Sequence, residues 1–123
     1  MITWMRGRIT RATLRANPRR IFLFGDNLSG VGRGGQAAEM RGEPNAIGVP
    51  TKKSPKMFIG SFFTDAEYEA NCSAIDAAFN KIPAGADVVV PVAGLGTGLA
   101  QLPERAPLTF EYLRKKLEVL GAE

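Results

Sequence analysis

Two glycine-dense segments, each directly after a short apolar run, constrain the fold of this chain more than any other feature. The runs at residues 21–24 (Ile-Phe-Leu-Phe) and 88–92 (Val-Val-Val-Pro-Val) have the pattern of buried strands. Residues 25–35 follow the first run and residues 94–98 the second, and together these loops hold eight of the fourteen glycines. Such loops expose backbone N–H groups, which suits them to phosphate.

The rest of the chain predicts an α/β fold, with residues 1–123 as one domain. Further strands are expected at residues 2–5, 8–13, 46–49 and 57–59, with Pro50 closing the third of these. Good helix formers predict a short helix at 35–41, and apolar residues at steps of three and four predict helices from Thr64 or Asp65 and from Pro107. Alternating strands and helices favour helices packed on a partly parallel sheet.

The net charge of +4 belongs to the N-terminal end, because residues 1–20 carry six arginines and no acid. Such a segment attracts nucleic acid or another anion through its long-range field, and it is equally compatible with a solvated surface. The candidate contacts to nucleic acid are Arg6, Arg8, Arg11 and Arg15. Trp4 lies among them and is expected in the core, with base stacking as its alternative.

Several classes of protein are disfavoured by composition. No apolar run approaches the roughly 20 residues of a membrane span, so no membrane contact and a cytoplasmic location are expected. The chain has no histidine and a single cysteine, so neither a metal nor a cofactor is expected, and a Ser-His-Asp or Cys-His nucleophile is excluded. Cys72 falls on the apolar face of the helix expected from Thr64, where a packed thiol is the favoured interpretation.

Two familiar nucleotide motifs fit the first glycine loop poorly. Gly30-x-Gly32-x-x-Gly35 matches the dinucleotide fingerprint formally, but no acid follows the next strand to hold a ribose. Gly25-x-x-x-x-Gly30 begins like a P-loop, but Val31 stands where that motif requires lysine. We therefore expect a more general arrangement, in which both loops lie at one sheet edge and clamp a diphosphate; the alternative is a pair of tight turns.

The chain resembles the macrodomain family, and more closely small macrodomain-like proteins of bacteria and phages. The resemblance rests on residues 21–27 (Ile-Phe-Leu-Phe-Gly-Asp-Asn), 32–38 (Gly-Arg-Gly-Gly-Gln-Ala-Ala) and 96–106 (Gly-Thr-Gly-Leu-Ala-Gln-Leu-Pro-Glu-Arg-Ala). It implies a three-layer fold with a mixed central sheet flanked by helices. It also implies that Asn27 contacts the distal ribose of an ADP-ribose-like ligand, with Gly32, Gly34 and Gly35 on one side of the diphosphate and Thr97 and Gly98 on the other.

One departure from this family concerns the base. Macrodomains usually place an aspartate after an early strand to hold the adenine amino group, whereas residues 9–15 here contain no acid. An extra phosphate or the end of a nucleic acid suits the arginines of this segment better than adenine does.

Individual side chains carry alternative interpretations. Asp26 either orients a water as general base or caps the loop through its own backbone. Asn27 either binds ribose hydroxyls with its amide or is a turn residue with positive φ. Arg33 and Lys52 are expected to neutralise phosphate unless both are merely solvated, and Gln36 is expected to bond either backbone or ligand.

Three hypotheses follow, of which the first is a module that binds an ADP-ribose-related or other diphosphate-containing nucleotide between the glycine loops. The second is a metal-free glycohydrolase that cleaves an ADP-ribosyl bond with Asp26 and Asn27. The third is a nucleic-acid-binding protein that uses the early arginines. The ligand-binding residues expected for the first are Gly25, Asn27, Gly32, Arg33, Gly34, Gly35, Gln36, Lys52, Gly96, Thr97, Gly98 and Leu99.

Overall fold

A four-stranded parallel sheet forms the centre of the protein in the computed structural model, which describes residues 1–122. The strands are β1 (Ile2–Met5), β2 (Arg20–Asn27), β3 (Ala46–Lys52) and β4 (Asp87–Pro91), in the order β1-β4-β2-β3. All three strand pairings are parallel, so the α/β class is confirmed and the expected mixed sheet is wrong. A helical crossover joins each strand to the next in sequence, which returns the chain to the same end of the sheet.

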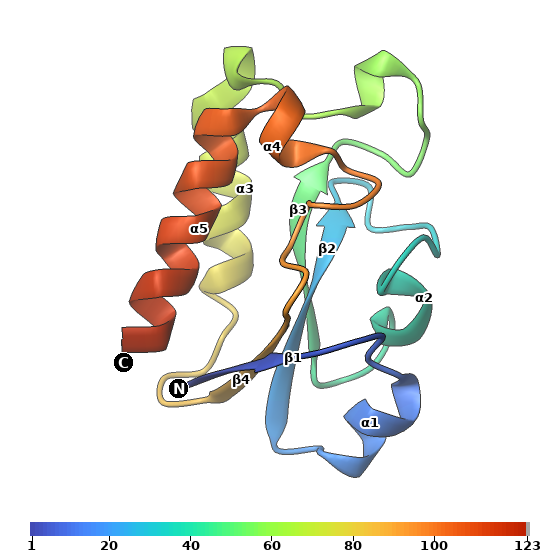
Figure 1. Ribbon diagram of the computed structural model, residues 1–123, viewed down its shortest axis with the longest axis vertical. Helices are drawn as coiled ribbons and strands as arrows, with labels where there is room; N and C mark the ends of the chain where they lie inside the picture. The colour runs from blue at the N-terminus through green and yellow to red at the C-terminus, as the bar shows by residue number, and fades with distance from the viewer. Residues whose placement is uncertain (123) are drawn as a thin grey trace.

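Helices cover both faces of this sheet (Figure 1). The helices α1 (Arg11–Ala16) and α2 (Ala37–Met40) lie on one face, and α3 (Tyr68–Phe79) and α5 (Pro107–Ala122) lie on the other. The short helix α4 (Leu102–Arg105) leads into α5. Two single 3₁₀ turns, Ile59–Ser61 and Asp65–Glu67, lie between β3 and α3.

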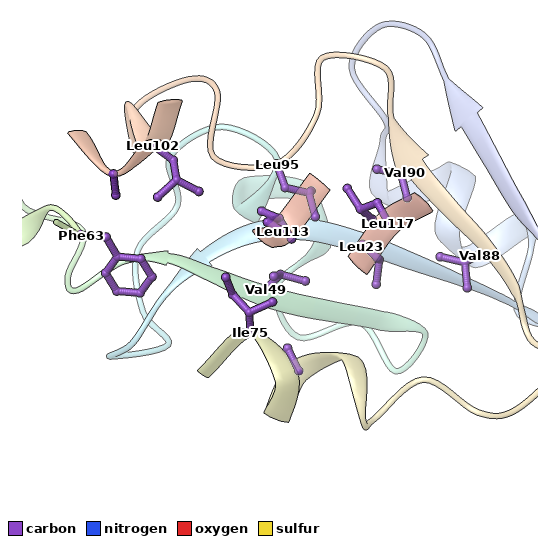
Figure 2. Packing of buried hydrophobic residues seen from close by; sticks show 12 residues of the cluster. Leu23, Val49, Phe63, Ile75, Val88, Val90, Leu95, Leu102, Leu113 and Leu117 are labelled. Atoms are coloured by element: carbon purple, nitrogen blue, oxygen red, sulfur yellow. The ribbon is translucent and has the colours of Figure 1, made fainter. Parts of the chain in front are cut away.

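The core is divided by the sheet into two apolar clusters, because successive side chains of a strand point to opposite faces. Leu23, Val88 and Val90 face α3 and α5, where they meet Ile75 and Leu113 (Figure 2). The opposite cluster holds the intervening strand residues with α1 and α2, namely Phe22, Phe24 and Val89 with Ile9, Leu14, Ala37 and Met40. Cys72 is buried on α3, and burial raises the pKa of its thiol, which supports a packing role.

Two of the expected strands are wrong. Residues 8–13 contain the start of α1, because the Thr10 side chain accepts a hydrogen bond from the N–H of Thr13 and caps the helix. Residues 57–59 form an exposed loop entering a 3₁₀ turn, and the isolated bridge from β3, Lys52–Phe62, falls beyond this segment.

Three local expectations also change. Pro50 does not close β3, which continues to Lys52; β3 is an edge strand, so the missing N–H costs no ladder hydrogen bond. Asp65 does not cap its own helix but accepts hydrogen bonds from the N–H groups of Leu108 and Thr109 at the start of α5. Trp4 is outside the core, because it lies on the edge strand β1 and is 48% exposed.

A hydrogen bond from Tyr112 of α5 to Asp76 of α3 joins the two helices on one face. The phenol donates to Oδ1 of Asp76 at 2.6 Å, and this carboxylate raises the pKa of Tyr112 to about 12. A folded-state pKa above the unfolded value means that the bond stabilises the protein fully below pH 10, and that this contribution is lost as the pH rises toward 12.

Tyr112→Phe is therefore expected to lower the free energy of unfolding by about 1 kcal/mol at neutral pH. The difference from the parent protein should shrink between pH 10 and about 12, because the parent loses the same bond there. Urea denaturation across this pH range measures both quantities. A difference that stays constant up to pH 12 would contradict the assignment.

Candidate functional site

The neighbouring strands β2 and β4 diverge at their carboxyl ends. They pair only from Arg20–Asp87 to Phe22–Val89, whereas β2 continues beyond this pairing to Asn27. The loop after β2 leads to α2 on one face of the sheet, and the loop after β4 leads to α4 and α5 on the other (Figure 1). Parallel sheets bind ligands at such a switch point, where adjacent loops leave in opposite directions.

The two glycine loops meet at this point through their backbones. A Cβ atom on Gly25 would lie 3.3 Å from the backbone nitrogen of Gly96. Gly96 has φ of +78°, and a Cβ there would lie 3.0 Å from both Thr51 and Leu102. Glycine is therefore required at residue 96 by conformation and by space together.

A cavity of about 400 Å³ lies between the loops. Nearly all of the residues expected at the site line it, namely Gly25, Asp26, Asn27, Gly32, Gly34, Gly35, Gln36, Lys52, Gly96, Thr97, Gly98 and Leu99. Arg33 does not line it but projects from the first loop as an exposed side chain. The predicted convergence of the two loops on one space is thus present in the fold.

A third segment, residues 51–55, closes the cavity from the edge strand β3. Thr51, Lys52 and Pro55 line the wall there, and Pro55 packs on Gly32 of the first loop. On the other side Leu99 packs on Gly34, so each neighbouring segment contacts the first glycine loop. Of these three residues, only Lys52 was predicted from the sequence, from its position just after an expected strand.

Backbone N–H groups of both loops are left without an acceptor in the protein. Within the described residues, the N–H groups of residues 31–37 and of residues 95–100 donate no hydrogen bond to another part of the chain. Most of these residues line the cavity. Two sets of donors therefore border one space, which is the arrangement that a multiply charged oxyanion requires.

Asp26 forms an ion pair with Arg41, a residue that the sequence analysis had not singled out. Its Oδ1 and Oδ2 accept from the guanidinium at 2.5 and 3.2 Å, and Oδ1 also accepts from the N–H of Asn27 at 2.8 Å. The two side chains are 14% and 23% exposed. Both carboxylate oxygens are thus engaged, which favours the loop-organising interpretation of Asp26 over that of a free general base.

Arg41 also holds the first glycine loop in place. Its guanidinium donates to the carbonyl oxygens of Gly30, Val31 and Gly32 at 2.7, 3.3 and 2.9 Å. The loop carbonyls therefore face Arg41, while the following N–H groups have no acceptor in the chain. The sequence signal for this role was weak, because it consisted of an arginine at the end of the short helix expected at residues 35–41.

Asn27 shapes the same loop from the end of β2. Its amide nitrogen donates to the carbonyl of Val31 at 2.7 Å, and its amide oxygen accepts from the N–H and hydroxyl of Ser29. The alternative interpretation of Asn27 as a turn residue with positive φ is wrong. Among residues 1–122, Gln101 is the single non-glycine residue with positive φ. Asn27 therefore lines the cavity with an amide whose two ends already have partners within the loop.

Two further predicted side chains bond the protein itself. Gln36 forms a two-way pair with the backbone of Ile9, accepting from its N–H at 2.7 Å and donating to its carbonyl at 2.8 Å. The Thr97 hydroxyl donates to the carbonyl of Ala93 at 2.5 Å and closes the second loop. Backbone groups are consequently the main donors that these segments offer to a ligand.

Lys52 is a buried cation in the cavity wall. The residue is 6% exposed, and its Nζ donates to the carbonyl of Lys56 at 2.7 Å and lies 4.8 Å from the centre of the Phe62 ring. Burial, and to a lesser degree the nearby Arg105 guanidinium, lowers the pKa of this ammonium. Among the described residues no carboxylate lies within 4.0 Å of it, so its charge is available to an anion.

Most of the early arginines are occupied by carboxylates or carbonyls. Arg8 pairs with Glu39, and both Arg11 and Arg15 pair with Glu43, whose pKa is lowered chiefly by Arg15. Arg11 also donates to the carbonyls of Ala38 and Arg41. These pairs fasten α1 to the α2 segment and reduce the positive field that this end of the chain offers to nucleic acid.

Within residues 1–122, no three His, Cys, Asp or Glu side chains gather as they would around a metal ion. None of the helices in that range combines the length and apolar character needed to cross a bilayer.

Comparison with known proteins gives one match. Residues 4–116 match the model of a family of unknown function (DUF7831). No curated protein and no solved structure matches the chain.

The contact between the two loops can be tested with glycine substitutions. Gly96→Ala is expected to lower the free energy of unfolding by about 2–4 kcal/mol, because left-handed strain of about 1–2 kcal/mol adds to overpacking against Thr51 and Leu102. Gly30 has φ of +66° but open space around an added Cβ atom, so Gly30→Ala should lower the free energy of unfolding by the left-handed strain alone. Gly98→Ala should change little, since it has neither constraint. Equal effects in urea denaturation at all three positions would contradict the loop contact.

The role of Arg41 can be tested against an exposed ion pair. Arg41→Met leaves the carboxylate of Asp26 without its partner and should destabilise the protein by about 2–3 kcal/mol. Arg114→Met removes pairs with Glu111 and Glu118 that are about half exposed, and it should cost no more than about 1 kcal/mol. In hydrogen exchange, Arg41→Met should also speed exchange of the Leu28 and Gly30 amides, which are hydrogen-bonded within this region. Indistinguishable stabilities of the two variants would refute the assignment.

Proposed function

The chain belongs to the family DUF7831, whose function is unknown, and from its own site we propose that it binds a diphosphate-containing nucleotide, of the ADP-ribose kind, between its two glycine loops. The observation that carries the proposal is the pair of loops bordering one cavity with backbone N–H groups that have no acceptor within residues 1–122. One row of donors holds one phosphate, and two facing rows suit the adjacent phosphates of a diphosphate.

Charge and size support the same class of ligand. Asp26 is the single acid in the cavity lining, and Arg41 neutralises it. Lys52 adds a positive charge that no carboxylate compensates, so the lining carries a net charge that favours an anion. The volume of about 400 Å³ lies within the range of about 300–1,000 Å³ typical of small-molecule sites.

The proposal concerns the diphosphate more than the base. No free carboxylate lines the cavity to accept hydrogen bonds from an adenine amino group. The macrodomain-like arrangement, in which Asn27 contacts a ribose, requires the Asn27 amide to exchange its bonds with Ser29 and Val31 for bonds to ribose hydroxyls. The loop amides need no such exchange, because they have no acceptor in the chain to give up.

Hydrolysis of an ADP-ribosyl bond is the enzymatic version of this proposal, and it has less support. A general base needs a carboxylate oxygen free to accept a proton from water, whereas both oxygens of Asp26 bond Arg41. Turnover of ADP-ribosylated protein or DNA that disappears in Asp26→Asn, a variant that keeps the size of the side chain, would establish it. Nucleic-acid binding through Arg6, Arg8, Arg11 and Arg15 is likewise less supported, because Glu39 and Glu43 pair with the last three.

Isothermal titration calorimetry with ADP-ribose, ADP and pyrophosphate tests the binding proposal. We expect heat of binding with all three, and binding weaker by about tenfold or more in Lys52→Met, because a cation in contact with an anion contributes roughly 1.5–3 kcal/mol. Lys53→Met is the matched control, since Lys53 lies outside the lining and pairs with Glu67. Absence of heat with every ligand, in folded protein, would overturn the proposal.

The pH dependence of binding gives an independent prediction. Because the pKa of Lys52 lies below its ordinary value of 10.5, the ammonium loses its charge at a lower pH than an exposed lysine does. Affinity for pyrophosphate should therefore weaken as the pH rises through that lowered pKa, and the dependence should be flatter in Lys52→Met. Calorimetry at several pH values measures it. The same slope in both proteins would exclude Lys52 as its source.

A further inference from the structure

The large apolar side chains that are exposed gather mainly on the loops around the cavity. Three of them, Met57, Phe58 and Ile59, are consecutive and are 51%, 58% and 80% exposed. They belong to the loop that follows the cavity wall at Pro55, and the Sδ atom of Met57 lies 3.2 Å from Nζ of Lys52 in that wall. This loop is the green segment that extends beyond β3 in Figure 1.

The other two loops around the cavity add to this surface. Leu28 and Val31 of the first glycine loop are 55% and 54% exposed, and Leu99 of the second is 57% exposed. Val31 and Leu99 line the cavity, where Leu99 packs on Gly34. Of the eleven large apolar side chains exposed in the described residues, six therefore belong to the three loops that enclose one cavity.

Cations without carboxylate partners accompany these apolar side chains. Arg33 of the first glycine loop and Lys56, next to Met57, are exposed and form no ion pair among the described residues. Arg105 lies with its guanidinium carbon 3.8 Å from the centre of the Phe62 ring and bonds the neutral side chain of Gln101. We call these cations and the six exposed apolar residues of the loops the rim.

We propose that the rim docks an acidic polypeptide segment that carries apolar side chains between its acids. Clusters of exposed apolar side chains on soluble proteins mark interaction surfaces, and charge complementarity to Arg33 and Lys56 selects an acidic partner. Four of the six apolar residues of the rim are aliphatic, and Phe58 is its single aromatic residue. A strand of nucleic acid would instead require several aromatic platforms for its bases.

This inference is independent of the proposed nucleotide. Docking involves exposed side chains of the loops, of which Val31 and Leu99 lie at the edge of the cavity, whereas the proposed diphosphate contacts backbone groups. A protein that binds no nucleotide can still bind the polypeptide, and the reverse also holds. The two proposals therefore fail separately, and each has its own variants.

Selection from a library of displayed random peptides, followed by fluorescence anisotropy with synthetic probes, tests the inference on the full chain. Selected peptides should be enriched in Asp and Glu together with Leu, Ile or Phe. A synthetic peptide of alternating Glu and Leu should bind more tightly than its Lys-Leu and Glu-Ser counterparts. Enrichment of basic peptides, or no enrichment over an unrelated protein, would overturn the proposal.

Matched substitutions locate the docking surface. Phe58→Ser and Ile59→Ser should each weaken binding of the Glu-Leu peptide by about tenfold, as exposed anchor residues of interfaces do. Val119→Ser is the control, because Val119 is 62% exposed on α5, away from the rim. Lys56→Glu should weaken binding more than Lys115→Glu, which changes an exposed lysine of α5.

Two outcomes would contradict the proposal directly. Equal effects of Phe58→Ser and Val119→Ser would mean that peptide binding does not involve the rim. Tighter binding of oligothymidylate than of the peptide, lost in Phe58→Ser, would assign the same surface to single-stranded nucleic acid. Circular dichroism of each variant confirms that loss of binding does not reflect loss of fold.

Discussion

The close approach of two backbones at Gly25 and Gly96 is the constraint on which the site depends. Strands β2 and β4 stop pairing after Phe22 and Val89, and the loop after β4 fills the opening at the end of the sheet. Side chains at these two positions would force the loops apart, and the N–H groups of residues 31–37 and 95–100 would then no longer border one cavity. The cavity is thus a consequence of strand divergence and of residues without a Cβ atom.

Arg41 is the second determinant, because it decides which backbone groups the first loop presents. One guanidinium neutralises Asp26 and donates hydrogen bonds to three loop carbonyls. Because the carbonyl oxygens of residues 30–32 bond Arg41, they are turned toward the protein. The N–H groups that follow have no acceptor among the described residues, so they can donate to an anion. Asn27 and Thr97 act in the same way on a smaller scale, since each closes a turn with its own side chain.

The sequence predicted those strands and helices whose burial determines the pattern of apolar residues. The apolar run at residues 21–24 lies in β2, and the run at 88–92 lies in β4 except for its last residue. The periodic segment after Thr64 forms α3, because a buried strand or helix face leaves few choices of residue type. Residues 8–13 and 57–59 were assigned wrongly since short alternation does not distinguish a strand from a capped helix or an exposed loop. The mixed sheet implied by the family resemblance was also wrong, because each helical crossover returns the chain in the same direction.

At the site, the sequence indicated which loops meet but not how their side chains are used. Glycine density alone led to both loops, and nearly all of the residues predicted there line the cavity. The ion pair of Asp26 with Arg41 and the pairing of the early arginines with Glu39 and Glu43 depend on contacts between distant segments, which local patterns do not encode. The unequal distribution of exposed apolar side chains likewise becomes visible only once the three loops are brought together.

The central claim is that the two glycine loops act together on one anion, and amide chemical shifts measured by two-dimensional NMR during a titration with pyrophosphate test it most directly. The account predicts that the amides of residues 31–37 and 95–100 shift with a single common affinity, while amides at the opposite end of the sheet stay unchanged. Shifts confined to one loop, or two different affinities for the two loops, would contradict it.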